Sequence, residues 1–279
     1  MKLMLLAFDS FSVRSMATYI ESKINILIDP GIAIGPSRYG LAPSKYEWKA
    51  LDEGRKKIIN YLKSTQVITI SHYHFDHHPF YDDHEFNQAA YKDKIVFTKS
   101  TTKINFSQKK RHSIFEKIAK PLAKELNYAD NNEYQIKGVK IRFSKPVFHG
   151  KENSRLGYVV MVTVESEKRI MHCSDIQGPI TKETTELIIN ENPDILIIGG
   201  PPTYFLGWRF STRDLNSAIQ NLKKILDNTD TSTIILDHHL LRDLKYRERI
   251  NLFGNKVITA AEFLNIKIKQ LEARRRELS

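Results

Sequence analysis

The sequence predicts an α/β protein with mixed β-sheets and helices on the outer faces. Apolar, β-rich runs recur along the whole chain, and segments with helical spacing of apolar residues lie between several of them. The first runs follow one another closely, which is typical of antiparallel pairing, whereas later runs alternate with helices, which is typical of mixed sheets. Since no Ser-, Gly- or Pro-rich linker divides the 279 residues, we expect one domain spanning residues 1–279.

Each expected element has its own local signal. Strands are indicated by β-branched or aromatic residues bounded by turn residues. These runs are 3–8, 16–21, 25–28, 67–70, 95–98, 139–143, 158–164, 169–172, 195–198, 233–236 and 256–259. Helices are indicated by apolar spacing of three and four over segments 46–63, 105–126, 181–190, 212–226 and 260–278. Long loops at 30–45, 149–157 and 199–210 follow strands, where binding and catalytic sites are commonly built.

Composition excludes several classes of protein. With 41% hydrophobic and 27% charged residues, the chain is neither disordered nor fibrous. No run approaches the about 18 apolar residues that a membrane span needs, and no small-residue cleavage site follows the apolar start. The single cysteine, Cys173, cannot form an internal disulfide or a CxxC metal site. We therefore expect a cytoplasmic protein without a membrane partner.

The positive charge is concentrated in two segments. The formal net charge is +11. Residues 99–124 hold eight Lys and Arg against one Glu, residues 240–279 hold ten against five acids, and the rest of the chain is close to neutral. A localised basic field attracts phosphate-rich partners, which include nucleic acids. The alternative is that these residues form a solvated face.

A dense group of metal-capable side chains follows the expected strand 67–70. Within SHYHFDHHPF, residues 71–80, it comprises His72, His74, Asp76, His77 and His78. Residues two apart in an extended strand share a face, so His72 and His74 can converge on one ion. A turn after His74 would let Asp76 and His77 face a second ion. Imidazole and carboxylate suit Zn²⁺ or a similar divalent transition metal, and the alternative is a His-rich surface loop.

Further motifs follow other expected strands in the order of a known signature. They are Asp29 in ILIDPG, His149 in PVFHG, Asp175 in IMHCSD, and His238 or His239 in DHHLLRD. With HxHxDH, they resemble the metallo-β-lactamase superfamily over most of the chain. SHYHFDHH, INFSQKKR and DHHLLRD further resemble the archaeal UPF0282 family. The resemblance implies an αββα sandwich, with two mixed sheets face to face, helices on the outer faces, and all motifs at one edge.

The resemblance also implies a dinuclear metal site. Its two divalent ions are expected to be Zn, with Mn or Fe as alternatives. The implied ligands are His72, His74 and His149 for one ion, Asp76, His77 and His238 for the other, and Asp175 for both. Such a pair of ions lowers the pKa of a shared water from about 15.7 toward neutrality and makes hydroxide available as a nucleophile.

Two carboxylates are candidate catalytic residues. Asp29 is expected to orient a ligand histidine by accepting its second ring N–H. Asp76 either ligates an ion or accepts a proton from the water. For the last motif we favour His238, because it precedes Arg242 by four residues, as in the HxxxR arrangement of tRNA 3′-processing members of the superfamily; His239 remains the alternative.

Four further histidines are interpreted as residues that do not bind metal. His78 is expected beside the ligands in the pocket, and His172 in the core or behind the ligands. His84 and His112 are expected at the surface.

The predicted function is metal-dependent hydrolysis of a phosphodiester, with nucleic acid among the candidate substrates. Arg155, Arg209 and Arg242 are the candidate phosphate contacts, because a guanidinium fork fits phosphate oxygens. No separate nucleic-acid-binding module is visible in the sequence. The expected partner is therefore a phosphate-containing substrate.

Two alternatives stay open. One is hydrolysis of a small thioester, lactone or sugar phosphate in a pocket walled by Tyr204, Phe205, Trp208 and the 30–45 loop. The other is a non-catalytic protein that keeps metal for structure. Structural metal sites usually have four ligands, fewer than the seven implied here, which favours an enzyme.

Overall fold

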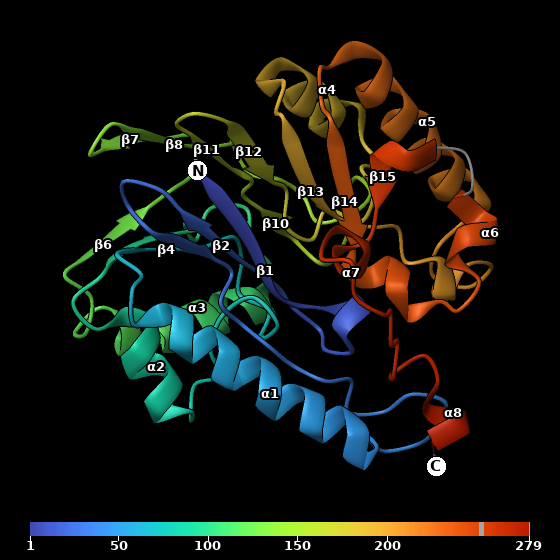
Figure 1. Ribbon diagram of the computed structural model, residues 1–279, viewed down its shortest axis with the longest axis horizontal. Coiled ribbons are helices and arrows are strands. Elements are labelled where there is room, and N and C mark those ends of the chain that lie inside the picture. The colour runs from blue at the N-terminus through green and yellow to red at the C-terminus, as the bar shows by residue number, and fades with distance from the viewer. Residues whose placement is uncertain (251–253, 279) are drawn as a thin grey trace.

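Two β-sheets packed face to face, each with helices on its outer side, form the fold (Figure 1). The structure is a computed structural model that describes residues 1–250 and 254–278. This arrangement is the predicted αββα sandwich of two mixed sheets.

The first sheet has the strand order β1-β2-β3-β4-β5-β6. Strands β1 to β3 pair antiparallel, as predicted for the early strands, and β3 to β6 pair parallel. The strands are β1 Lys2–Phe8, β2 Met16–Glu21, β3 Ile26–Ile28, β4 Val67–Ile70, β5 Ile95–Thr98 and β6 Glu125–Tyr128. Helices α1 Lys45–Leu62, α2 His84–Tyr91 and α3 Phe106–Ala119 cover its outer face (Figure 1).

The second sheet has the order β15-β14-β13-β12-β11-β8-β7. Its strands β12 to β15 are parallel and the remaining pairs are antiparallel. The strands are β7 Glu133–Ile136, β8 Val139–Phe143, β11 Val162–Glu165, β12 Arg169–His172, β13 Ile195–Gly199, β14 Thr233–Asp237 and β15 Val257–Ile258. Helices α4 Lys182–Glu191 and α5 Thr212–Asn228 pack on its outer face, and β9 Val147–Phe148 pairs with β10 Tyr158–Val159 as a separate ribbon.

Alternate residues of the strands divide between separate apolar cores. Ile197 of β13 lies in the core between the sheets, whereas its neighbours Leu196 and Ile198 pack in the core that faces α4 and α5. In the first sheet, Ile28 and Leu27 divide in the same way. Because both faces of these strands are covered, their sequences are almost continuously apolar rather than alternating.

The predicted helix over residues 260–278 is wrong. Two short helices stand at its ends, α7 Ala260–Phe263 and α8 Arg275–Leu278, and the chain between them is irregular. Asn265 and Gln270 have positive φ, which an α-helix does not allow. In the segment between the two short helices, Lys269 N donates to the Ser10 carbonyl and Leu271 N donates to Ser12 Oγ, not to carbonyls four residues earlier. Hydrogen bonds to distant parts of the chain have replaced the helical ones, and these tertiary contacts outweigh the local helix propensity.

Other predicted boundaries also change. The predicted 158–164 strand is interrupted at Val160, whose N–H donates to the Ser71 carbonyl, so β10 and β11 join different sheets. The predicted 105–126 helix ends at Ala119, since β6 takes the residues from Glu125 onward. Helix α2 and strands β6 and β7 were not predicted, because they are short and only partly apolar.

The connections contain further short elements. They are α6 Tyr246–Ile250 and the 3-10 turns η1 Asp9–Phe11, η2 Thr203–Phe205, η3 His238–Arg242 and η4 Gly254–Lys256. None of the helices within residues 1–250 and 254–278 is long and apolar enough to span a membrane.

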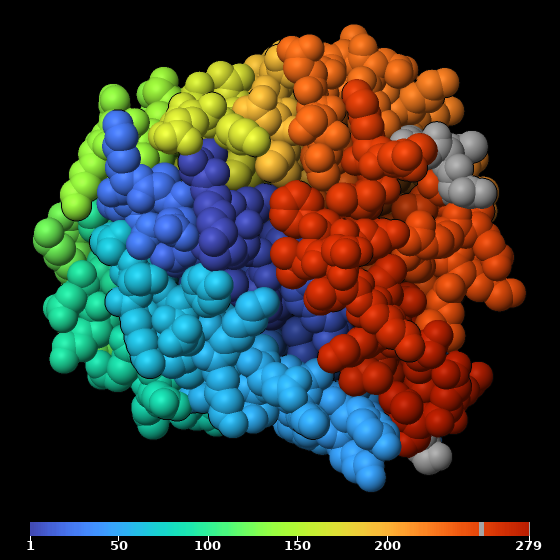
Figure 2. All heavy atoms as spheres, in the orientation of Figure 1, coloured from blue at the N-terminus to red at the C-terminus, as the bar shows by residue number. Residues whose placement is uncertain are grey.

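A buried ion pair fixes the C-terminal segment to the N-terminal half, and Figure 2 shows the two parts packed against each other. Arg275 is fully buried, and its Nη2 and Nε donate to both carboxylate oxygens of Glu47, at 2.6 and 3.0 Å. Arg275 also donates to the carbonyls of Gly35 and Leu41. Glu47 itself closes the capping box at the start of α1. The guanidinium therefore joins the C-terminal segment to residues 35–47, which lie more than 220 positions earlier in the chain.

We expect Arg275→Ala to destabilise the protein by about 3–5 kcal/mol, because it leaves the buried Glu47 carboxylate without its partner. The free energy of unfolding, measured by urea denaturation, checks this. The matched control is Arg274→Ala, an exposed neighbour whose removal should cost less than about 0.5 kcal/mol. Equal losses for the two variants would show that the Glu47 pair is not a stabilising anchor.

Candidate metal centre

The candidate ligands lie at the carboxyl ends of strands from both sheets and from the β9 ribbon. The segment that begins at Ser71 follows β4, and His149 follows β9. Asp175 comes shortly after β12, and His238 directly after β14. The structure thus brings the sequence motifs together at one edge of the sandwich.

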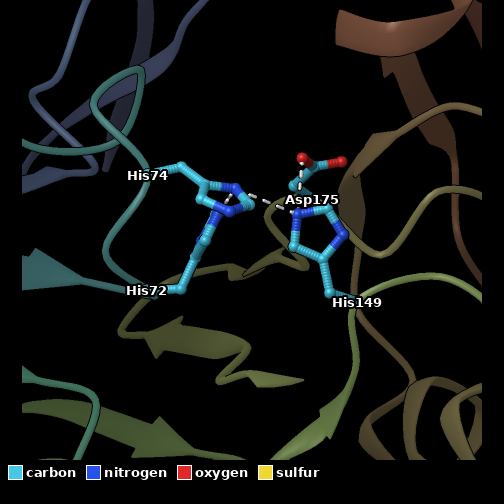
Figure 3. Close-up of side chains that lie close together, drawn as sticks. All are labelled: His72, His74, His149 and Asp175. Atoms are coloured by element: carbon cyan, nitrogen blue, oxygen red, sulfur yellow. Dashed lines mark hydrogen bonds and ion pairs between the residues drawn. The ribbon is translucent and has the colours of Figure 1, made fainter. Parts of the chain in front are cut away.

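The first ligand group consists of three histidines and a carboxylate, and Figure 3 shows these side chains converging from different segments. Its members are His72, His74, His149 and Asp175. His74 Nδ1 lies 3.0 Å from His72 Nε2 and 3.3 Å from His149 Nε2. His149 Nε2 also lies 2.9 Å from Asp175 Oδ2. One donor atom from each residue lies within 4.8 Å of the others, which is close enough for a single ion.

A second group lies beside the first and approaches the same aspartate. It consists of Asp76, His77 and His238. His238 Nε2 is 3.6 Å from Asp76 Oδ2 and 3.7 Å from Asp175 Oδ2. Asp175 therefore lies between the two groups, at the position expected for a shared ligand.

Both histidines of the last motif reach the site. His238 joins Asp76 and His77, the partners predicted for it. His239 Nε2 lies 2.9 Å from Asp175 Oδ2. Its other nitrogen, Nδ1, lies 3.2 Å from both the Tyr204 hydroxyl and Arg242 Nη1.

Two buried carboxylates orient histidines of the second group. His77 Nδ1 donates to Asp29 Oδ2 at 2.8 Å, and His238 Nδ1 donates to Asp9 Oδ2 at 2.7 Å. With the proton fixed on Nδ1, each ring directs the lone pair of Nε2 into the cluster. Asp29 has the orienting position that the sequence analysis gave it. Asp9 was missed, although it ends β1 as Asp29 ends β3, and that parallel was the available signal.

The protonation states suit cation binding. Burial, with the adjacent His149, lowers the pKa of His74 to about 3, and burial also holds the pKa of His72 well below its usual value. Burial alone would raise the pKa of Asp175, but His149 and His239 outweigh it and keep that pKa well below the usual range. His72 and His74 are thus neutral and Asp175 is ionised, the forms that coordinate a divalent ion. In the second group, burial is outweighed by Asp29, which raises the pKa of His77, and by Asp9, which raises the pKa of His238 to about 10, so metal binding there must displace a ring proton.

Three buried polar atoms of the candidate ligands are left without a hydrogen bond. Within the described part of the chain, His77 Nε2, His149 Nδ1 and Asp175 Oδ1 have no partner. Buried polar atoms are nearly always hydrogen-bonded, so unpaired ones need an explanation. Their place in a cluster of imidazole and carboxylate groups fits metal coordination, and the donor set suits zinc and related transition metals.

Gly31 brings the loop after β3 against the histidine segment. A Cβ built on Gly31 would lie 2.1 Å from His78 N and 2.4 Å from His77 N. Ser15 Oγ donates to the Gly31 carbonyl at 2.6 Å and holds this contact. Only glycine lets the two backbones come this close, so Gly31 helps to set the position of the His77 ring.

A cavity of about 450 Å³ opens beside the ligands. It combines ligand side chains with basic and apolar wall residues. The walls include Arg14, Arg111, Arg242, Phe75, Leu156 and Phe205. Arg14 and Arg111 were missed by the sequence analysis. Arg111 lies in the basic segment 99–124, where nothing local marks which residues face inward.

The predicted substrate contacts are divided between the cavity and the surface. Arg242 lines the cavity. The Tyr204 hydroxyl lies 3.2 Å from His239 Nδ1. Trp208 is 70% exposed, and the guanidinium of Arg209 lies 4.0 Å from its ring centroid. Arg155 is exposed and its carbonyl accepts from Asn105 Nδ2. Of these five, only Arg242 is among the residues that line the cavity.

Three of the remaining histidines are buried. His112, which we expected at the surface, packs against Tyr73, so that expectation is wrong. The reason is that His112 lies on the inward face of α3. His78 is buried and bonded to the Pro79 carbonyl, and His172 is buried with its Nε2 3.1 Å from the Met16 carbonyl.

Comparisons with known proteins identify relatives along the entire chain. No family model matches the chain. A UPF0282 protein of Methanocaldococcus jannaschii is 45% identical over 287 residues, which cover all of this chain and 96% of the relative. A UPF0282 protein of Thermococcus kodakarensis is 44% identical over 288 residues, covering all of this chain and 95% of the relative.

Solved structures with this fold are distant in sequence. A possible metal-dependent hydrolase from Veillonella parvula has a TM-score of 0.58 at 15% identity, over 88% of this chain and 94% of that one. The metallo-β-lactamase fold protein YhfI from Bacillus subtilis gives 0.53 at 13%, over 88% of both chains. A diphosphatase from the PhnP family gives 0.52 at 14%, over 88% and 81%. The fold is therefore the metallo-β-lactamase fold, as predicted.

We expect Gly31→Ala to disturb both stability and metal binding, because its methyl group would displace the backbone of His77 and His78. Loss of bound metal, measured by elemental analysis after loading, and a lower urea midpoint check this. Gly138→Ala is the comparison, since its φ of +80° costs about 1 kcal/mol while its Cβ meets only the tip of Lys23. If Gly31→Ala binds metal as the unaltered protein does, the close approach does not position the ligands.

Proposed function

The chain belongs to the UPF0282 family, and we propose that it is a metal-dependent hydrolase whose dinuclear metal site activates water to cleave a phosphodiester. The observation that carries the proposal is the pair of adjacent ligand groups that meet at Asp175. Seven converging donors exceed the four of a usual structural site, and a cavity opens directly onto them. Both features favour an enzyme over a protein that keeps metal for structure.

The proposed ligands follow the two groups. We assign His72, His74 and His149 to one ion, Asp76, His77 and His238 to the other, and Asp175 to both. Zinc is the proposed metal, with manganese or iron as alternatives. Bound ions of this kind supply a hydroxide near neutral pH and stabilise negative charge on the reacting group.

The hydrogen bonds of the last motif support His238 rather than His239 as the ligand. Arginine can only donate, so Arg242 Nη1 beside His239 Nδ1 makes that nitrogen the acceptor. Because burial lowers the pKa of His239 to about 4, the ring is neutral and its proton lies on Nε2, which donates to Asp175. In His238 the proton that donates to Asp9 lies on Nδ1, so Nε2 is the atom left to bind metal; it lies 3.3 Å from Arg242 Nη2.

The other proposed roles belong to carboxylates and to Arg242. Asp29 and Asp9 hold the rings of His77 and His238 in place. Asp76 is exposed to the cavity and is the proposed proton acceptor for the attacking water in addition to being a ligand. Arg242 Nη2 lies 3.8 Å from Asp76 Oδ2 and stabilises its ionised form.

The phosphodiester assignment rests on the cavity wall. Three arginines line the cavity together with the candidate ligands, and guanidinium is the side chain best matched to phosphate oxygens. One structural neighbour is a diphosphatase, which acts on a phosphate-containing substrate. A nucleic-acid strand could also stack on the exposed Trp208 and Arg209 pair at the surface.

A second candidate is hydrolysis of a small thioester, lactone or sugar phosphate. The cavity favours it through its size, about 450 Å³, and its apolar wall residues Phe75, Leu156 and Phe205. These are the properties of a small-molecule pocket. Charge separates a phosphodiester from a thioester or lactone, because these neutral esters gain nothing from a guanidinium group, whereas a sugar phosphate shares the phosphate.

Metal analysis of ligand variants tests the dinuclear site. We expect the unaltered protein to bind two divalent ions per chain. Asp175→Ala should weaken binding of both ions, and His238→Ala should lose one of them. His239→Ala and the exposed control His84→Ala should keep nearly full metal content. If His239→Ala loses metal and His238→Ala does not, the assignment of the last ligand is wrong.

Substrate assays test the reaction. Metal-loaded protein should hydrolyse bis(p-nitrophenyl) phosphate, and Asp76→Ala should abolish turnover because the variant removes a ligand and the proposed proton acceptor. If RNA is the substrate, its cleavage should weaken with rising salt, since phosphate contacts are lost to counterions. Thioesters and lactones are assayed in parallel, and turnover of only these uncharged esters would assign the second candidate.

A further inference from the structure

The three guanidinium groups on the cavity wall differ in how their charge is balanced. Arg14 Nε and Nη2 donate to both oxygens of Glu272, at 2.7 and 2.6 Å. Arg242 Nε donates to Asp9 at 2.6 Å. Among residues 1–250 and 254–278, no carboxylate oxygen lies within 4 Å of the Arg111 guanidinium.

The contacts of Arg111 orient its guanidinium without neutralising it. Nη1 lies 3.4 Å from the Tyr73 carbonyl, a long hydrogen bond. The guanidinium carbon lies 4.7 Å from the centroid of the Phe75 ring, over its face. Since Phe75 stands between the ligands His74 and Asp76 in the chain, the positive charge is held next to the metal centre.

Helix α3 presents Arg111 from a fixed position. The buried stripe of this helix includes Gln108, His112 and Phe115, and Arg111 lies beside it, half-buried. Gln108 Nε2 donates to the carbonyl of Leu156, another residue of the cavity wall, at 2.6 Å. By contrast, Lys110 on the same helix turn is exposed. The basic segment therefore divides into a surface part and one inward-facing cation.

A half-buried cation without an anionic partner is costly in an isolated cavity. Burial lowers the pKa of Arg111, and among its neighbours Asp76 acts against this shift. In the proposed holoenzyme the Asp76 carboxylate is engaged by metal. The cavity then contains a guanidinium fork that lacks a counter-charge and faces the position where substrate would enter.

We propose that Arg111 is a substrate-binding residue that receives an anionic, phosphate-like group and selects phosphate esters over neutral esters. The inference rests on the proposed function, because the anion is the substrate's own phosphoryl group beside the metal site. A guanidinium fork donates two parallel hydrogen bonds to phosphate oxygens, and the Arg111 guanidinium is held over the Phe75 ring, 4.7 Å from its centroid. Arg14 and Arg242 are less available, since carboxylates already occupy them.

Binding of inorganic phosphate to metal-loaded protein, measured by calorimetric titration, tests the inference. We expect Arg111→Gln to weaken phosphate binding about 10- to 100-fold, the range for losing a charge-assisted hydrogen bond. Lys110→Gln, an exposed neighbour with the same charge change, should stay within about twofold. Metal content and thermal unfolding of each variant show whether the site is intact. Arg111→Met, which keeps the packing on Phe75, replaces the Gln variant if that one unfolds or loses metal.

The outcomes separate this inference from the proposed function. If the neutral Arg111 variant keeps its full metal content and binds phosphate as tightly as the unaltered protein, the inference is overturned. This holds even if the protein hydrolyses bis(p-nitrophenyl) phosphate. Equal weakening by Lys110→Gln also overturns it, since the effect would then be that of general surface charge. Phosphate binding that depends on Arg111 supports the inference. It does so even if the protein hydrolyses no phosphodiester, because that result would contradict only the proposed reaction. With bis(p-nitrophenyl) phosphate, support takes the form of a raised KM with a smaller change in kcat.

Discussion

The buried carboxylate of Asp29 is the interaction on which the rest of the site depends. It accepts hydrogen bonds from His77 Nδ1, from the N–H and hydroxyl of Ser71, and from the hydroxyl of Ser174. These donors follow β4 of the first sheet and β12 of the second, while Asp29 itself follows β3. Burial raises the pKa of Asp29, but His77 and these hydrogen bonds more than offset it, so the carboxylate stays charged. One anion thus joins both sheets and orients a ligand.

Asp9 has the corresponding place on the other side of the site. It ends β1 and accepts from His238 and Arg242, which follow β14. His238 has a φ of 55°, a left-handed conformation that is uncommon for a residue other than glycine. The Asp237 carboxylate accepts hydrogen bonds from the backbone N–H groups of His238, Ser10 and Ala260, and these bonds fix the turn. The unfavourable backbone conformation persists because surrounding hydrogen bonds determine it, as is common at functional sites.

The sequence was sufficient for the features that local pattern determines. Covered strands read as apolar runs, and HxHxDH after such a run places its members at a strand end. The sequence was insufficient where the position and burial of a residue depend on contacts with residues that are distant along the chain. Residues 264–274 have helical spacing but bond to the η1 region instead. Lys99 and Arg275, counted as parts of basic segments, are buried beside Asp130 and Glu47. The other lysines of the first basic segment are exposed, and Arg111 is the half-buried one that lines the cavity.

This redistribution of charge changes which property argues for the substrate. Net charge does not say which cations meet a substrate, whereas Arg14, Arg111 and Arg242 line the same cavity as the candidate ligands, and Arg242 Nη2 lies 3.8 Å from Asp76 Oδ2. The ligands lie at strand ends that the sheets hold rigidly, but the wall comes from other elements: Arg111 from α3, Arg242 from η3 and Phe205 from η2. Such elements can vary without moving the strand ends, so one ligand arrangement can serve several chemistries. We therefore expect the wall to determine which substrate is bound, and we expect the largest contribution from Arg111, the wall arginine that has no carboxylate partner among the described residues.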